Sequence, residues 1–217
     1  MNNFQYVAEK QLTPVKKDLI QIIKSVQNQV RQDFTFQFDF VGSAERNMVT
    51  YDVKSNVGFD FDVDIHVNKD ECKFSAKVIK TKIRVALDKV THCYGYDNAE
   101  DSTRVLTIKV KDKSDSRILH SCDFAIVNDF IDGDGNKRQE YIHFNKRQNK
   151  YSWQKQSQEF YLLEEKVEWI KARELWQNVL DLYLKKKNQN KDPHKHSRSI
   201  YAETIHEICQ KYGYYNK

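Results

Sequence analysis

The stretch of sequence that decides the fold is Phe59-Asp60-Phe61-Asp62-Val63-Asp64-Ile65-His66-Val67. Apolar and polar side chains alternate along it, as they do in a β-strand that buries one face. Residues two apart in a strand point the same way, so Asp62 and Asp64 project from one face, about 7 Å apart. Two carboxylates on one strand face repel each other and are costly to desolvate unless a cation lies between them. The stretch therefore predicts a half-buried strand whose polar face holds a cation.

Two segments outside this strand carry groups that suit the same cation. Asp123 lies within a second alternating segment, residues 118–127, and its carboxylate would complete a two-metal site. Hard cations such as Mg²⁺ bind oxygen ligands and share them with substrate phosphates. Gly42-Ser43 follows the alternating segment 34–41, where a glycine lets backbone N–H groups approach a phosphate. These positions predict a site in which carboxylates, divalent cations and a phosphorylated substrate meet.

The remaining periodicity predicts an α+β protein. Period-two alternation predicts five strands and a hairpin turn at 132–135; the strands are 34–41, 59–67, 103–110, 118–127 and 140–145. Apolar residues at helical spacing predict helices over 14–32, 71–90, 160–187 and 199–212. Thr13 is the expected N-cap of the first helix, with Pro14 as its first residue. We expect a mixed β-sheet lobe with flanking helices over residues 1–150 and a C-terminal helical lobe over 151–217.

Length and composition limit the class of protein. With 217 residues and a formal net charge of +5, the chain is long enough for one domain or one bilobal unit with a buried core. Hydrophobic residues make up 39% of it and Gly and Pro are few, which excludes fibrous and wholly disordered classes. No apolar run is long enough to cross a membrane, no secretory pattern is visible, and the four Cys are widely spaced. We therefore expect a cytoplasmic protein with reduced thiols and no membrane partner.

The three motifs occur in an order that resembles a known superfamily. A Gly-Ser after a strand, an Asp-x-Asp on the next strand and a single Asp on a third strand are typical of polymerase-β-like nucleotidyltransferases, and here they are Gly42-Ser43, Asp62-Val63-Asp64 and Asp123. The layout is similar to the branch that contains oligoadenylate synthases, cyclic GMP-AMP synthase and their bacterial relatives. In that branch a long helix precedes the Gly-Ser, and a helical C-terminal lobe closes the nucleotide cleft. The resemblance extends over residues 10–210.

The resemblance implies a nucleotidyltransferase-type fold and a reaction. A Mg²⁺- or Mn²⁺-dependent enzyme would move NMP from an NTP to an acceptor hydroxyl and release pyrophosphate. Asp62, Asp64 and Asp123 would be the catalytic metal ligands, with Asp123 also a candidate general base, and Gly42 and Ser43 would hold the triphosphate. ATP is the expected donor. The acceptor stays open among a second nucleotide, an RNA 3′ end, a protein hydroxyl and a small molecule.

Five further residues are candidates for nucleotide binding. Arg46 follows the Gly-Ser motif and is either a phosphate contact or a surface residue. In the related two-lobed enzymes a Lys on a C-terminal-lobe helix and a Ser on the next helix grip the triphosphate, which implies Lys185, Lys187 and Ser199 here. A solvated basic helix end explains the two lysines equally well. Tyr201 is a candidate for stacking on a base, although packing is the commoner role of a tyrosine.

Two departures from the family pattern leave alternatives open. The gap from Ser43 to Asp62 is 19 residues, longer than in compact members, so an extra loop or strand is expected between them. The second departure is that Asp60-Phe61-Asp62 also fits the acidic pattern. The pair Asp62 and Asp64 is preferred because Ile65-His66-Val67 continues the strand beyond it, as in the family.

Two other functions fit the same residues. One is a non-catalytic nucleotide- or RNA-binding module on the same fold, for which the basic part of the chain would matter most. Residues 137–198 contain 15 Lys+Arg and 8 Asp+Glu, although a single bound NTP would also account for this surplus. The other is an adenylyltransferase of small molecules such as antibiotics, which shares the donor chemistry and differs in the acceptor.

Overall fold

Two parallel strands, β4 (Val57–His66) and β7 (Ile118–Ile131), lie next to each other in the main sheet. The structure is a computed structural model, and it describes residues 2–54, 57–112, 114 and 117–214. Parallel neighbours cannot be joined by a tight turn and need a long crossover connection. Here the crossover contains α3 (Ala76–Val90), the 3-10 turn η1 (Thr91–Tyr94), β5 and β6.

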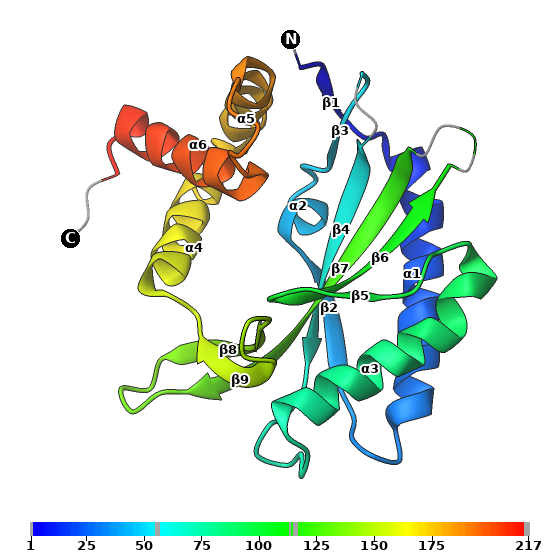
Figure 1. Ribbon diagram of the computed structural model, residues 1–217. Helices are drawn as coiled ribbons and strands as arrows, with labels where there is room; N and C mark the ends of the chain where they lie inside the picture. Colours follow the sequence, from blue (N-terminus) through cyan, green and yellow to red (C-terminus); the bar gives the residue numbers. More distant parts are fainter. Residues whose placement is uncertain (1, 55–56, 113, 115–116, 215–217) are drawn as a thin grey trace. The chain divides into compact units, whose positions relative to one another are not determined.

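The other strands of this sheet pair antiparallel on either side of the β4–β7 pair (Figure 1). On one side β2 pairs with β4; on the other, β6 pairs with β7 and β5 with β6. The second half of β7 pairs with β8, which forms a hairpin with β9. The bounds are β2 (Gln37–Val41), β5 (Glu100–Asp101), β6 (Val105–Lys111), β8 (Lys137–Asn145) and β9 (Lys150–Lys155).

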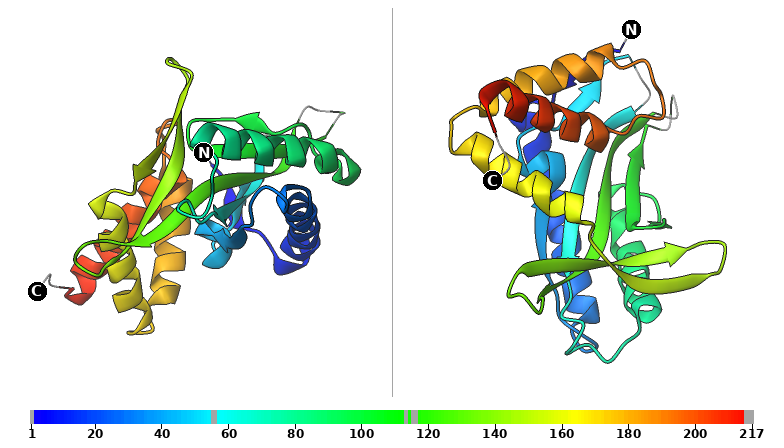
Figure 2. Two further views of the ribbon diagram at one scale, coloured as in Figure 1. Left: turned by 90° about the horizontal axis from the view of Figure 1, so that it is seen from below. Right: turned by 90° about the vertical axis from the view of Figure 1, so that its left-hand side faces the viewer.

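Helices α1 (Glu9–Val30) and α3 cover one face of this sheet (Figures 1 and 2). The alternation of apolar and polar residues along β4 explains why the helices pack on this face. Phe61, Val63 and Ile65 point towards the helices, and each is 1% exposed. The aspartates of β4 point to the opposite face. The five predicted strands and the first two predicted helices are present in this unit, although their ends differ from those predicted. The apolar side of the sheet forms the core of the larger unit.

The first helix begins earlier than predicted. It starts at Glu9, with Ala8 as the capping residue, so Thr13 is not the N-cap and Pro14 lies inside the helix. Pro14 has no N–H to donate to the carbonyl of Lys10, a loss that usually disrupts a helix. Lys10 and Pro14 are both exposed, so water can solvate the Lys10 carbonyl and the helix tolerates the proline. The second predicted helix is also shorter, because Ser75 caps α3 by accepting a hydrogen bond from the Val78 N–H.

A second, smaller unit contains the helices of the C-terminal part. They are α4 (Gln158–Lys171), α5 (Trp176–Gln189) and α6 (Ser197–Tyr212), and α6 packs on both α4 and α5 (Figure 2). The single helix predicted over 160–187 is therefore wrong. The chain breaks between α4 and α5, where Glu174 adopts a left-handed backbone with φ of 57°. No Gly or Pro stands at this break, so no local signal in the sequence marks it.

Residues from the beginning of the chain also belong to this smaller unit. It comprises Met1–Tyr6, Thr50–Ser55 and Ser157–Lys217, and the larger unit comprises Val7–Val49 and Asn56–Gln156. Strand β1 (Phe4–Tyr6) pairs antiparallel with β3 (Thr50–Asp52), and the Tyr6 hydroxyl donates a 2.7 Å hydrogen bond to the Leu180 carbonyl in α5. These units differ from the predicted division at 150/151 in two ways. Strand β9 belongs to the larger unit because it pairs with β8, and the pair of β1 and β3 belongs to the smaller unit because β1 packs on α5. The strand β3 occupies the long gap before Asp62.

No helix in the described part of the chain combines the length and the apolar character that crossing a membrane requires. The sheet and the helices together form a mixed α+β architecture with a separate helical unit, as the sequence predicted.

A buried ion pair links three elements of the larger unit. Lys80 of α3 is 1% exposed, and its ammonium lies 2.9 Å from an Asp101 carboxylate oxygen in β5. The Tyr151 hydroxyl of β9 donates a 2.7 Å hydrogen bond to the same carboxylate, and Lys80 also donates to the Ser102 carbonyl. Burial lowers the pKa of Lys80, while Asp101 opposes this effect by stabilising the charged ammonium.

We expect Asp101→Asn to lower the free energy of unfolding by about 3 kcal/mol, because it leaves a buried ammonium without its counter-charge. Urea denaturation measures this. The matched control is Asp97→Asn, which removes an exposed Lys–Asp pair with the same kind of contact, 2.7 Å to Lys111. The control should cost less than about 1 kcal/mol. Equal losses in the two variants would contradict the structural role of the Lys80–Asp101 pair.

Candidate active site

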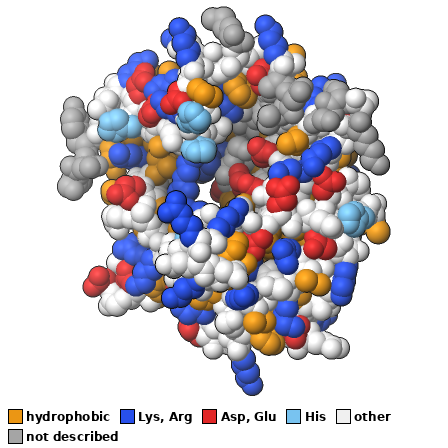
Figure 3. Space-filling model, in the orientation of Figure 1, with side chains coloured by type: hydrophobic (Ala, Val, Ile, Leu, Met, Phe, Trp, Pro, Cys, Tyr) orange, Lys and Arg blue, Asp and Glu red, His pale blue; other side chains and the backbone are white. Residues whose placement is uncertain are grey.

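The carboxylates of Asp62 and Asp123 are brought together by the pairing of β4 with β7. In the parallel register Asp62 is the direct partner of Asp123, so both side chains project from the face of the sheet that α1 and α3 leave uncovered. The Thr107 hydroxyl of β6, opposite Asp123, donates a 2.5 Å hydrogen bond to one of its carboxylate oxygens. Two of the three predicted metal ligands therefore lie side by side. Acidic side chains gather over this part of the sheet (Figure 3).

The Gly-Ser motif lies next to Asp62. Gly42 starts a short turn of helix, α2 (Gly42–Glu45), directly after β2, and it has a φ of 68° that favours glycine. A Cβ atom at Gly42 would lie 2.5 Å from an Asp62 carboxylate oxygen, so only glycine leaves that carboxylate in place. Val41, the residue before it, is the register partner of Asp62. Arg46 follows α2, and its guanidinium acts on Asp62 electrostatically.

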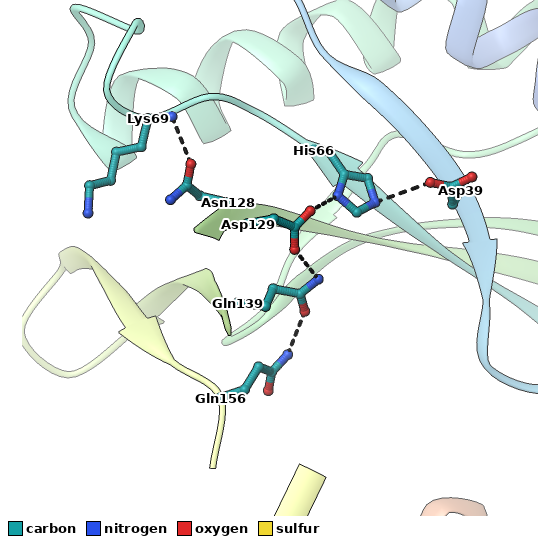
Figure 4. Close-up of polar contacts among 7 residues, drawn as sticks. All are labelled: Asp39, His66, Lys69, Asn128, Asp129, Gln139 and Gln156. Atoms are coloured by element: carbon teal, nitrogen blue, oxygen red, sulfur yellow. Dashed lines mark hydrogen bonds and ion pairs between the residues drawn. The ribbon is translucent and has the colours of Figure 1, made fainter. Parts of the chain in front are cut away.

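Asp64 lies one step further along the same face of β4, in a network of polar side chains. His66 contacts Asp129 through Nδ1 at 2.6 Å and lies 3.5 Å from Asp39 through Nε2 (Figure 4). Gln139 of β8 donates a 3.1 Å hydrogen bond to Asp129 and also hydrogen-bonds Asp64. Asp64 is therefore surrounded by polar and charged side chains from its own strand, β4, and from β7 and β8.

The network continues towards the end of the larger unit. Gln156 donates a 3.0 Å hydrogen bond to the Gln139 side chain, and it accepts one from Arg104. The Arg104 guanidinium lies 3.8 Å from the centre of the Tyr141 ring. Figure 4 shows the sequence of contacts from His66 through Asp129 and Gln139 to Gln156. Sequence reasoning missed these residues, because the predicted strand ended at 127, before Asp129.

Electrostatics distinguish the carboxylates of β4. The pKa of Asp62 is raised to about 6, mainly by burial and then by the nearby carboxylates of Asp123 and Asp60, while Arg46 opposes the rise. Burial also raises the pKa of Asp64 to about 6, where His66 opposes the effect and Asp129 adds to it. Asp60, by contrast, is exposed, and its carboxylate accepts a hydrogen bond from the Ser121 hydroxyl. The raised pKa values show that negative charge at Asp62 and Asp64 lacks full compensation from the protein.

A divalent cation fits this donor set. Burial raises the pKa of Asp123 too, so three neighbouring positions hold carboxylates whose ionised form is disfavoured. Among the described residues no three histidine, cysteine or carboxylate side chains are arranged to enclose a metal ion by themselves. Mg²⁺ does not need such an enclosure, since it keeps several waters and binds through one or two carboxylates plus substrate phosphates. Oxygen donors on an open strand face match that preference.

The remaining candidates lie in the smaller unit and differ in their surroundings. Lys185 and Ser199 are exposed. Lys187 is 7% exposed, donates a 2.8 Å hydrogen bond to the Thr50 hydroxyl, and lies 4.1 Å from the centre of the Phe4 ring. Tyr201 is also buried and packs edge-on against another tyrosine, Tyr183, with ring centres 6.4 Å apart. Lys187 and Tyr201 thus take part in packing, whereas Lys185 and Ser199 face solvent.

The raised pKa of Asp62 predicts how stability depends on pH. A carboxyl group with a higher pKa in the folded state binds its proton more tightly there, so its contribution is full below about pH 4 and is lost as the pH rises through about 6. Asp62→Asn removes this loss. In metal-free buffer the variant should exceed the wild type in free energy of unfolding by about 1–3 kcal/mol near pH 7.5, and by much less near pH 4.

Urea denaturation at both pH values, with a chelator present, measures this difference. Asp134→Asn in the exposed β7–β8 turn is the control, and its free energy of unfolding should match that of the wild type at both pH values. An Asp62→Asn effect that is the same at both pH values would contradict the proposed cause.

Of three comparisons with known proteins, one found similar folds. No protein-family model matches the chain, and no curated protein matches it. Solved structures do match. The CdnE c-di-GMP synthase from Capnocytophaga granulosa has a TM-score of 0.58 at 16% identity, over 98% of this chain and 64% of that one. The CdnE cyclic dinucleotide synthase from Elizabethkingia meningoseptica, solved with GTP and Apcpp, has a TM-score of 0.50 at 15% identity, over 88% and 67%.

A third solved structure gives the same result. DncV from Vibrio cholerae, bound to 3′-deoxy ATP, has a TM-score of 0.56 at 13% identity, over 93% of this chain and 52% of that one. The chain thus spans about two thirds of the two CdnE chains and about half of DncV. Another DncV structure is described as a prokaryotic cGAS homolog. The resemblance predicted from the three motifs is therefore confirmed at the level of the fold, which is that of the bacterial relatives of cyclic GMP-AMP synthase.

Proposed function

We propose that the protein is a Mg²⁺- or Mn²⁺-dependent nucleotidyltransferase that moves NMP from an NTP to an acceptor hydroxyl and releases pyrophosphate. The observation that carries the proposal is the direct pairing of Asp62 with Asp123. Gly42 lies next to this pair, at a position where the Cβ of any other residue would collide with the Asp62 carboxylate. Carboxylates in register on adjacent strands are unfavourable for stability, so their presence favours a role in binding cations. The shared fold with nucleotide-bound synthases supports the same reaction class.

We propose Asp62, Asp64 and Asp123 as the metal ligands. Asp62 and Asp64 are both partly buried with raised pKa values, a property that clusters at functional sites, whereas Asp60 is exposed and already bonded to Ser121. When bound there, the cations would neutralise the phosphates and lower the pKa of the attacking hydroxyl. The Asp123 carboxylate would accept the proton of that hydroxyl, and its hydrogen bond from Thr107 fixes the orientation it needs.

The Gly-Ser motif and Arg46 would hold the triphosphate. The glycine lets the backbone approach a phosphate closely, and the Ser43 hydroxyl is a further donor. Arg46, whose positive charge already acts on Asp62, would bind a phosphate that is held next to this carboxylate by a cation. Lys185 and Ser199 stay predictions from the resemblance, and the side chains of both are exposed. Lys187 and Tyr201 are engaged within the smaller unit, and we assign them a structural role.

We propose ATP as the donor and a second nucleotide as the acceptor. The support comes from the similar solved structures, which are synthases of cyclic dinucleotides or nucleotide-bound forms of them. A nucleotide acceptor would give a linear or cyclic dinucleotide. An RNA 3′ end, a protein hydroxyl or a small molecule would use the same donor chemistry, and the products distinguish these acceptors.

The transferase reaction is tested with all four NTPs and Mg²⁺ or Mn²⁺, followed by mass spectrometry of the products. We expect pyrophosphate release together with a dinucleotide. Asp62→Asn/Asp123→Asn should reduce the rate at least about a hundredfold, because the cations lose both paired carboxylates. A rate that survives this double substitution would rule out the site. Salt-sensitive RNA binding without turnover would instead support a binding module.

A second experiment separates the two acidic pairs. Asp64→Asn should reduce the rate at least about a hundredfold, because Asp64 is a proposed metal ligand. Asp60→Asn is the matched control, since it lies at the same distance from Asp62 on the same strand face. It should retain the rate within about tenfold. The reverse order would assign the metal pair to Asp60 and Asp62.

A further inference from the structure

A cavity in the larger unit lies beside the C-terminal third of α1, away from the carboxylates. It has a volume of about 270 Å³ and is bounded by α1 and the segment that leads into β2. Its lining residues are Lys24, Gln27, Asn28, Arg31, Thr35 and Phe36. The helix α1 covers the apolar face of the sheet, whereas Asp62 and Asp123 project from the other face. The cavity is therefore separate from the proposed active site.

The charge of this cavity is positive and uncompensated. Lys24 lies on α1 and Arg31 is the helical residue that follows its last residue, so the two lie seven residues, or two turns, apart on one side of the helix. Within the described part of the chain neither makes an ion pair or a hydrogen bond through its side chain, and the lining contains no carboxylate. The nearby Asp33 is already paired with Lys82 at 2.7 Å. Two cations that share a concave wall favour an anionic ligand.

Polar groups and an aromatic floor complete the site. Gln27 donates a 2.8 Å hydrogen bond to the Phe36 carbonyl, which ties the wall formed by α1 to the segment before β2. Phe36 is 6% exposed and belongs to the hydrophobic core. Asn28 lies between the two cations along the helix, and Thr35 also lines the cavity, so an amide and a hydroxyl add neutral donors.

We propose that this cavity binds a phosphate-bearing small molecule through Lys24 and Arg31. Arg and Lys together with neutral N–H and O–H donors are the groups that recognise a phosphate, and no lining group repels one. The volume lies below the usual range of about 300–1,000 Å³ for drug-sized ligands, which favours a phosphate or a small phosphate monoester. The site does not depend on the proposed transferase activity, because it lies on the other face of the sheet.

The test is a titration of the ¹⁵N-labelled protein with inorganic phosphate and, separately, with AMP as a phosphate monoester. Saturable shifts of the Gln27 and Asn28 side-chain amide signals are expected. Lys24→Gln/Arg31→Gln should raise the Kd at least about tenfold, because both charge-assisted contacts with the anion are lost. Tighter binding of AMP identifies a monoester as the ligand, and tighter binding of phosphate identifies the free anion.

Lys10→Gln/Lys17→Gln is the matched control. It removes two exposed cations with the same seven-residue spacing from the same helix, outside the cavity. The control should bind like the wild type, which shows that the effect does not come from net charge alone. The single variants Lys24→Gln and Arg31→Gln each change one exposed residue, and each should weaken binding. An absence of saturable shifts, or equal weakening by the two double variants, would overturn the proposal.

Discussion

The parallel pairing of β4 with β7 is the constraint on which the rest of the structure depends. It places two carboxylates, Asp62 and Asp123, in direct register on one face of the sheet. The same register places Phe61 beside Cys122 and Val63 beside Phe124 on the other face, where α1 and α3 cover them. A shift by one residue would bury the aspartates in the core, so the hydrophobic pattern that fixes the register also fixes the site.

Much of the fold could be predicted because the alternation in β4 is unbroken over nine residues. Phe59 to Val67 gave the strand, its buried face and the acidic face opposite, and Gly42-Ser43 and Asp123 gave the order of the motifs. The positive φ of Gly42 and its closeness to Asp62 then provide a physical reason for the glycine. The mixed sheet with flanking helices and a helical unit was predicted correctly for these reasons.

Features that depend on tertiary contacts could not be predicted. The break between α4 and α5 falls at Glu174, which no local signal marks. Residues from 151 were assigned to the C-terminal helical lobe, because only the pairing with β8 shows that β9 belongs to the sheet. The partners of Asp64 come from β7 and β8, beyond the strand that was predicted to end at residue 127. Lys187 looked like a phosphate-binding lysine, yet its buried contact with Thr50 depends on a strand distant in sequence.

The central claim is that the acidic face of β4 and β7 holds divalent cations together with a nucleotide. Isothermal titration of Mn²⁺ into the full chain, in the presence of a non-hydrolysable ATP analogue, measures this most directly. In the wild type we expect saturable binding that weakens as the pH falls through about 6, where Asp62 and Asp64 become protonated. In Asp62→Asn/Asp123→Asn we expect that binding to be lost. Equal Mn²⁺ binding by the two proteins would show that these carboxylates do not hold the cations.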